Sequence, residues 1–210
     1  MTNTRLYTLC LLAWLTLFIL MFGSVANAQV IQTDRSGFTI APTPVESLQL
    51  EVGSLISNGT PLDFAILMRI PSKIMEIRLQ ADEDAHFGVK FPLLPEAWNG
   101  IDFAVIPTLT LSVVDEPLMT TRLAWGLSLP SHVKLDGNFL LGKDEALSVR
   151  VSRKDEAPAF WAFGEYFYER DHHLGVGGTK AFNNRFQFDF SFGWQIPEAT
   201  LYWQMGFVVR

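Results

Sequence analysis

Apolar and polar residues alternate along most of the chain after residue 45, and the stretch from Arg185 to Ile196 shows this pattern most clearly. Every second residue from Phe186 to Ile196 is aromatic or aliphatic, and the residues between them are Gln, Asp, Ser and Gly. Successive side chains of a strand point to opposite faces, so this stretch is predicted to form a strand with one oily face and one polar face. Its length is about that of a tilted strand crossing a bilayer, roughly 9 to 11 residues.

The same alternation recurs in shorter segments that are separated by turns rich in Gly, Pro, Asn and Asp. The predicted strands cover residues 48–53, 62–69, 75–80, 86–91, 101–113, 122–129, 133–141, 147–152, 159–169, 174–179, 185–196 and 201–210. Pro107 lacks a ladder donor and therefore indicates an edge, a bulge or a misplaced boundary. Aromatic residues fall on both faces of 159–169, so Trp161 and Phe163 are assigned to this strand without a side.

The first 28 residues have the organisation of a signal peptide. A short basic start precedes an apolar run from Leu6 to Phe22, and Ala26 and Ala28 then supply a small-residue cleavage pattern. An uncleaved anchor helix is the alternative. Because the only cysteine, Cys10, lies in this segment, the mature chain is expected to have no thiol, disulfide or cysteine metal site.

The mature chain is expected to divide into two parts. Residues 29–45 carry Pro42 and Pro44 among mixed polar residues, which predicts an extended N-terminal arm. Residues 46–210 hold all the alternating segments and form the predicted β-barrel domain. The arm is the one segment expected to reach into the barrel lumen, because the links between strands are short.

Twelve alternating strands are compatible with either a soluble sandwich or a closed barrel. Phe and Trp recur on the apolar face in strand after strand, which would crowd a sandwich core about 10 Å thick. A lipid face accepts them and excludes charge, since Arg or Lys near the bilayer midplane costs roughly 2 to 4 kcal/mol. The prediction is an all-β fold: an antiparallel up-and-down transmembrane β-barrel of about 12 strands, preceded by a helical signal peptide. A soluble periplasmic β-barrel or sandwich that binds a ligand is the alternative.

Compartment and partners follow from this fold. The chain is expected in the bacterial outer membrane after export through the periplasm, with outer-membrane lipid, the barrel-assembly machinery and a small-molecule solute as partners. The formal charge of −6 argues against nucleic acid, because phosphate binding needs a basic surface. No cofactor is indicated.

Several segments resemble outer-membrane proteins of the family named for the MetA-pathway of phenol degradation, which includes proposed transporters. The resemblance lies in His173–Thr179 and Asn184–Gly193, with shorter pieces at Arg69–Ile70, Met75–Leu79 and Gly88–Lys90. It covers most of residues 46–210 and consists of loose strand patterns without a catalytic signature. It implies a role in taking up small, often hydrophobic or aromatic, compounds.

The alternation assigns a polar set to the lumen and an apolar set to lipid. The predicted pore-lining residues are Glu51, Asp63, Arg69, Glu76, Arg78, Lys90, Asp102, Arg122, Lys134, Asp136, Arg150, Lys180, Arg185 and Asp189. The predicted lipid-facing residues are Phe186, Phe188, Phe190, Phe192, Trp194, Trp125, Trp203 and Phe207. Because the lumenal set mixes both charge signs, it can pair across neighbouring strands rather than form a selectivity ring of one sign.

These features favour a narrow channel or transporter for small compounds. A structural outer-membrane barrel without transport is the main alternative, since paired charges also stabilise a wet lumen. A membrane-embedded lipid hydrolase is the least favoured class, because His86, His132, His172 and His173 lie outside any nucleophile motif. The pair His172 and His173 is expected at a turn, and no catalytic or metal-binding residue is predicted.

Overall fold

The computed structural model describes residues 40–57, 60–98, 100–130, 132–142, 145–153, 160–183, 185–196 and 199–210. For residues 55–57, 60–63, 94–98 and 160 it describes the backbone alone. The predicted signal peptide at 1–28 and the arm residues 29–39 lie outside these ranges.

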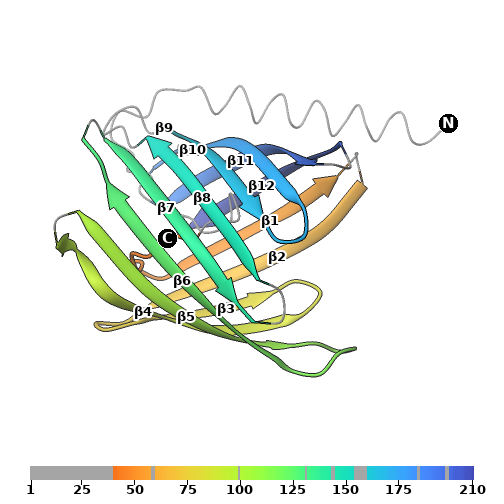
Figure 1. The fold of residues 1–210 in the computed structure, drawn as a ribbon, viewed down its shortest axis with the longest axis horizontal. Helices are drawn as coiled ribbons and strands as arrows, with labels where there is room; N and C mark the ends of the chain where they lie inside the picture. The colour runs from red at the N-terminus through yellow and green to blue at the C-terminus, as the bar shows by residue number, and fades with distance from the viewer. Residues whose placement is uncertain are drawn as a thin grey trace.

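Twelve antiparallel strands form one closed barrel, in which each strand pairs with its neighbours in sequence (Figure 1). The strands are β1 (Gln49–Ser57), β2 (Thr60–Pro71), β3 (Glu76–Ala81), β4 (Ala85–Trp98), β5 (Ile101–Leu111), β6 (Leu118–Ser128), β7 (Val133–Leu141), β8 (Ala146–Arg153), β9 (Phe160–Tyr168), β10 (His172–Ala181), β11 (Phe186–Ile196) and β12 (Thr200–Val209). This confirms the predicted up-and-down barrel of about 12 strands.

The barrel closes where the last strand meets the first. β1 and β12 pair from Leu50 opposite Val209 to Ser57 opposite Tyr202. At the start of this seam, Arg210 Nε donates a hydrogen bond to Ser47 Oγ over 2.5 Å. Closure pairs both edges of every strand, so the sheet has no open edge.

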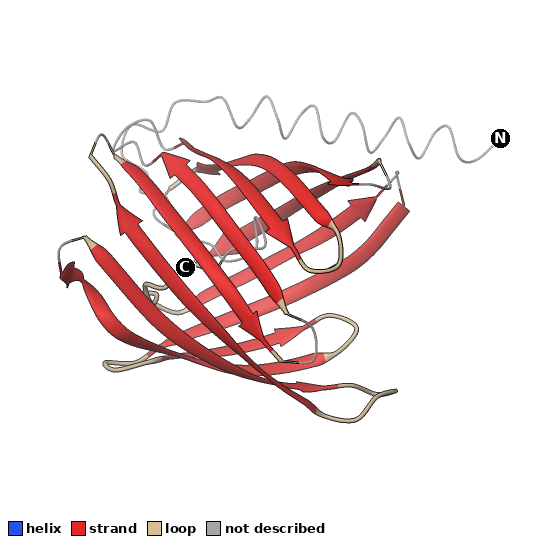
Figure 2. Cartoon of the chain, viewed as in Figure 1, coloured by secondary structure: helices blue, strands red, loops and turns tan. Residues whose placement is uncertain are grey.

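The described part of the chain is built from strands and short turns, without helices (Figure 2). Among these residues, no helix is long and apolar enough to span a bilayer.

The strands sort their side chains as the alternation predicts, with apolar side chains on the outer surface and polar ones inside. Large apolar side chains are exposed around the barrel, among them Phe64 on β2, Phe87 on β4, Phe139 on β7, Val176 on β10 and Phe192 on β11. The buried set is instead rich in charged and polar residues: Glu51, Arg69, Glu76, Lys90, Asp102, Asp136, Arg150, Gln187 and Asp189. A water-soluble domain has the reverse arrangement.

Aromatic side chains gather on the outer face near one end of the barrel. Tyr166 and Tyr168 at the end of β9 lie beside His172 at the start of β10, and Tyr166 Oη is 2.8 Å from His172 Nδ1. Trp194 pairs with Leu174 on the same face. Aromatic girdles of this kind mark the lipid–water interface in membrane barrels.

Three local predictions need revision. β4 continues to Trp98, seven residues beyond the predicted strand 86–91, and register shifts lie between Pro92 and Trp98. Pro107 lies inside β5 opposite Thr121, and the ladder from β4 has no pair at that position, so the proline interrupts one ladder without ending the strand. His172 begins β10 and does not belong to a turn.

Glycines allow two large aromatic rings to lie flat on the barrel wall. Trp125 covers Gly137 on the outer face, and a Cβ at Gly137 would collide with its ring. Tyr202 covers Gly193 on the inner face in the same way.

The contact between Trp125 and Gly137 predicts that Gly137→Ala destabilises the barrel by about 1 to 3 kcal/mol, because the indole must leave its position against the wall. Unfolding in urea, followed by tryptophan fluorescence of the protein in lipid vesicles, measures this loss.

Gly164→Ala is the matched control on the same outer face, since a Cβ there would meet only the Gly175 carbonyl oxygen, at 4.0 Å. It should be neutral, or stabilising by up to about 1 kcal/mol, because alanine loses less backbone entropy on folding. Equal effects of the two substitutions would contradict the packing role of Gly137.

Candidate functional site

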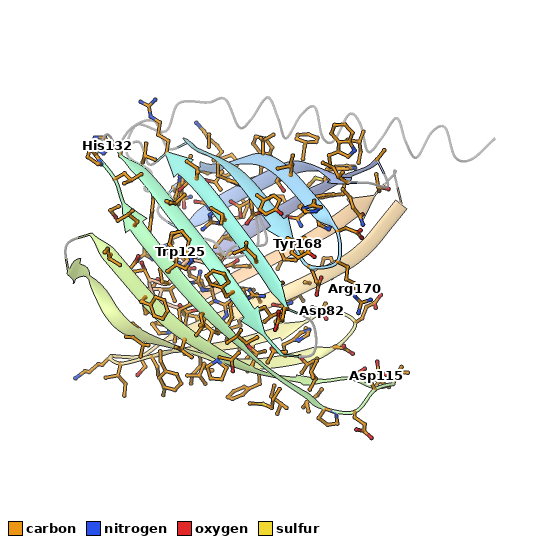
Figure 3. The ribbon with its side chains drawn as sticks, viewed as in Figure 1. Asp82, Asp115, Trp125, His132, Tyr168 and Arg170 are labelled. Atoms are coloured by element: carbon orange, nitrogen blue, oxygen red, sulfur yellow. The ribbon has the colours of Figure 1, made fainter. Side chains whose placement is uncertain are left out.

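The two ends of the barrel are distinguished by the chain termini. The terminal rim holds the start of β1 and the ends of β2, β6, β10 and β12. The opposite rim holds the turns at 82–84, 112–117 and 169–171. In Figure 3, His132 lies at one end, and Asp82, Asp115 and Arg170 lie towards the other.

A buried ion network, the Glu76 cluster, joins β1 to β4 inside the barrel. It consists of Glu51, Arg69, Glu76, Arg78 and Lys90. Arg69 Nε and Nη2 donate to Glu76 Oε1 and Oε2 over 2.9 and 3.0 Å, and Arg69 Nη1 lies 3.2 Å from Glu51 Oε1. Arg78 Nη1 and Lys90 Nζ also approach Glu76 Oε1, at 2.9 and 3.5 Å. Glu76 therefore interacts with three cations.

A second network, the Asp102 cluster, joins β5, β7 and β8. Lys134 Nζ lies 3.4 Å from Asp102 Oδ2 and 3.5 Å from Asp136 Oδ1, and Arg150 Nη2 lies 3.3 Å from Asp136 Oδ2. Asp102 and Asp136 both pair with Gly126 on the strand between them. A Cβ at Gly126 would collide with Asp102 Oδ1, so the glycine lets two carboxylates share one lysine across β6.

Residues 40–45, the described part of the predicted arm, lie inside the barrel, against the wall formed by β3, β4, β5 and β7. Asn138 on β7 bonds the backbone of Ile40, Asp102 on β5 accepts from the Thr43 hydroxyl over 2.6 Å, and Glu76 on β3 accepts from Val45 N–H over 2.9 Å. Ile40, Ala41, Pro42 and Val45 are buried. Residues 40–45 thus occupy lumenal space beside both ion networks.

Aromatic rings line the inner face of the remaining wall. Phe163 and Phe167 on β9 face inward. They are opposite Gly177 and His173 of β10, which share the inward row of Thr179 and buried Asp189. His173 lies 5.4 Å from Phe167 and 5.8 Å from Tyr202, measured between ring centroids. The Arg150 guanidinium stands 5.9 Å from the centre of the Phe163 ring. The lumen therefore has a charged wall carrying the arm and a wall with several flat apolar surfaces.

Most of the predicted pore-lining residues lie on the inner face. Buried inward positions are occupied by Glu51, Arg69, Glu76, Arg78, Lys90, Asp102, Asp136, Arg150 and Asp189, and Lys134 joins them through its ion pairs. Arg122 lies on the inner face as well, because it is opposite Ile106, a buried residue on the inward row of β5. Arg185 precedes β11 in a turn at the terminal rim, and the side chain of Asp63 lies outside the described residues.

Lys180 is on the other face, so its assignment to the pore is corrected. It pairs with Phe188 of β11, whose outward row it shares, and the inward neighbour is Thr179, which pairs with Asp189. Lys180 lies close to the end of β10 at the terminal rim, where a long side chain can extend its ammonium group to the headgroup region.

Seven of the eight predicted lipid-facing residues lie on β11 and β12, and the eighth, Trp125, lies on the outer face of β6. Phe188 pairs with Phe207 and Phe192 pairs with Trp203, so both strands present these rings on the same side. Phe188 differs from the prediction in its exposure, which is only 4%. Its ring packs between Phe190 and Phe207, at centroid distances of 6.3 and 5.2 Å.

Sequence reasoning missed several lumenal groups. The inward position of Glu165 could have been predicted, because a charged residue is excluded from the lipid face. Phe163 and Phe167 share its face of β9 and therefore also point inward. The role of Asn138 could not have been predicted, since nothing in its strand indicates a hydrogen bond to Ile40, 98 positions earlier. No group of three or more His, Cys, Asp or Glu side chains suited to a metal ion lies within the described ranges.

The comparisons identify the fold. No protein-family model and no curated protein matches the chain. Among solved structures, a KdgM porin in complex with disordered oligogalacturonate matches with a TM-score of 0.65 and 8% identity, over 77% of this chain and 98% of that one. The NanC porin matches with a TM-score of 0.56 and 4% identity, over 78% and 100%. Omp33 of Acinetobacter baumannii, an outer-membrane protein, matches with a TM-score of 0.51 and 9% identity, over 78% and 97%.

The chain therefore has the fold of outer-membrane β-barrels. More particularly, it is similar over most of its length to porins of that class, at sequence identities that relate the folds alone.

The Glu76 cluster predicts that Glu76→Gln destabilises the barrel by about 3 kcal/mol or more, because Arg69, Arg78 and Lys90 lose the carboxylate they share while staying buried. Urea unfolding in vesicles measures the loss. Glu46→Gln is the control: Glu46 pairs with Arg210 at the terminal rim, its side chain is 87% exposed, and its removal should cost less than about 1 kcal/mol. Equal losses would contradict the buried network.

The turn after β3 predicts a dependence on pH. Burial raises the pKa of Asp82, but hydrogen bonds from Asp84 N–H, the Gln80 amide and the His86 ring outweigh it and hold the pKa below its ordinary value. Ionised Asp82 should therefore stabilise the turn above its unfolded pKa, roughly 3.9, and this stabilisation should be lost as the pH falls through the lower folded pKa. Hydrogen exchange at Asp84 N–H measures it, and Asp82→Asn should abolish the pH dependence. Unchanged protection across this range would contradict the assignment.

Proposed function

We propose that this protein is an outer-membrane channel for small compounds, with a lumen narrowed by its own N-terminal arm. The observation that carries the proposal is the inverted surface: apolar side chains cover the outside of a closed barrel whose interior holds charged residues. Only a barrel surrounded by hydrocarbon is stabilised by this arrangement, because each backbone group is paired and the outer side chains avoid charge. A soluble periplasmic barrel would expose a far larger apolar surface than monomeric proteins tolerate.

The interior supports a selective channel more than an open pore. Residues 40–45 and the two ion clusters lie along β1 to β8, so the passage left for a solute is bounded by the opposite wall, β9 to β12. That wall offers the rings of Phe163, Phe167 and Tyr202. Flat apolar surfaces support the solute class implied by the resemblance to the MetA-pathway family, namely small hydrophobic or aromatic compounds.

A polyanionic solute is less well supported. One of the similar structures is a KdgM porin in complex with oligogalacturonate, an oligosaccharide whose sugar units carry carboxylates. Here the lumenal cations Arg69, Arg78 and Lys90 converge on Glu76, and Lys134 is shared by two aspartates. Cations that are already paired attract an anionic solute weakly.

A barrel without transport is the competing function, and it is favoured by the same buried ion pairs. Planar-bilayer recordings separate the two. The native protein should conduct weakly, and deleting residues 29–45 should raise the unit conductance, because the arm then leaves the lumen. Replacing residues 40–45 with a Gly-Ser segment of equal length is the control that keeps the chain length while removing the arm's contacts.

Each variant must show heat-modifiable migration on gels, which reports a folded barrel. If the folded, arm-deleted protein does not conduct, the channel proposal fails and the structural role stands. If deletion leaves an existing conductance unchanged, the arm does not narrow the passage.

A further inference from the structure

The barrel holds its arm largely through the arm's backbone. Asn138 Oδ1 accepts a hydrogen bond from Ile40 N–H over 2.6 Å, and Asn138 Nδ2 donates to the Ile40 carbonyl oxygen over 2.7 Å. One side-chain amide thereby bonds both backbone groups of a single residue. This pairing requires an extended residue with a free N–H and does not depend on its side chain.

Two more backbone contacts follow along the arm, at Thr43 and Val45, three and then two residues further on from Ile40. Lys90 Nζ lies 3.5 Å from the Thr43 carbonyl oxygen, and Glu76 Oε2 accepts from Val45 N–H over 2.9 Å. Both involve a charged side chain, and such hydrogen bonds are stronger than neutral ones. The Thr43 hydroxyl adds a side-chain contact by donating to Asp102 Oδ2 over 2.6 Å. The wall thus presents donors and acceptors at the spacing of an extended peptide.

The arm's own sequence suits this wall. Pro42 and Pro44 have no N–H, so they place no unsatisfied donor in the lumen, and their fixed backbone angle favours an extended chain. Ile40 is buried in a small apolar cluster with Ala104, Ile106 and Ala124. The two alanines leave space beside the wall for the isoleucine side chain.

We propose that the inner face of β3, β4, β5 and β7 is a binding site for short, extended, proline-containing peptides, and that residues 40–45 are its resident occupant. The inference rests on the proposed channel, because an outside peptide reaches this face through the lumen. Covalent attachment gives the arm a high effective concentration, so the arm excludes a free peptide until it is removed.

The test uses the barrel lacking residues 29–45, folded in detergent, and a labelled, N-acetylated peptide of the sequence Ile-Ala-Pro-Thr-Pro-Val. The peptide should bind this barrel saturably by fluorescence polarisation and should bind the full-length barrel much more weakly. Methylation of the isoleucine nitrogen removes the donor to Asn138 and should weaken binding at least about tenfold.

Paired variants of the arm-deleted barrel localise the site. Asn138→Leu should weaken binding of the acetylated peptide at least as much as N-methylation does, because it removes both the acceptor of the isoleucine N–H and the donor to the isoleucine carbonyl oxygen. Gln204→Leu is the matched control: this amide on β12 accepts from Ser191 Oγ, on the other wall, and its loss should leave peptide binding unchanged.

The outcomes separate this inference from the channel proposal. A folded, arm-deleted barrel that conducts but does not bind the peptide overturns the peptide site and leaves the channel intact. Peptide binding by a barrel that does not conduct overturns both proposals, because a peptide reaches the inner face only through an open lumen. Equal binding of the acetylated, N-methylated and sequence-scrambled peptides would mean partition onto an apolar surface, and it also overturns the site.

Discussion

The structure depends on the pairing of β1 with β12. A strand in hydrocarbon has no water to satisfy its backbone, so a sheet is stable there only when its first and last strands pair with each other. The seam from Leu50 opposite Val209 to Ser57 opposite Tyr202 meets this requirement. Closure also separates an inner from an outer face, and every later feature of the protein belongs to one of the two.

The inner face accommodates its charges through small residues. Gly126 leaves space for Asp102 and Asp136 to approach the same lysine, and Gly177 and Gly193 leave space for the rings of Phe163 and Tyr202. Where bulky side chains stood at these positions, the charged and aromatic groups would compete for the same volume near the barrel axis. The placement of glycines opposite large side chains on neighbouring strands therefore shapes the lumen as much as charge does.

The period of two was enough to predict the barrel, its strand number and the inward position of the charges that became the Glu76 and Asp102 clusters. Lys180 was assigned to the pore although it lay beyond the predicted strand 174–179; β10 continues to Ala181, so Lys180 follows inward Thr179 and points out with Phe188. Register, bulges and strand ends such as β4 at Trp98 depend on the partner strand. The bond from Ile40 to Asn138 depends on the closed three-dimensional lumen, so no local pattern could reveal it.

The neighbouring ends of the barrel domain have a consequence for its connectivity. Arg210 and Ser47 are hydrogen-bonded across the seam, so residue 210 lies next to the residues that lead into β1. A circular permutant that joins residue 210 to residue 46 and opens a turn at the opposite rim would retain all twelve strand pairings. Its arm, however, would no longer lead directly into β1. The direct connection of residues 40–45 to β1 is thus what delivers them into the lumen.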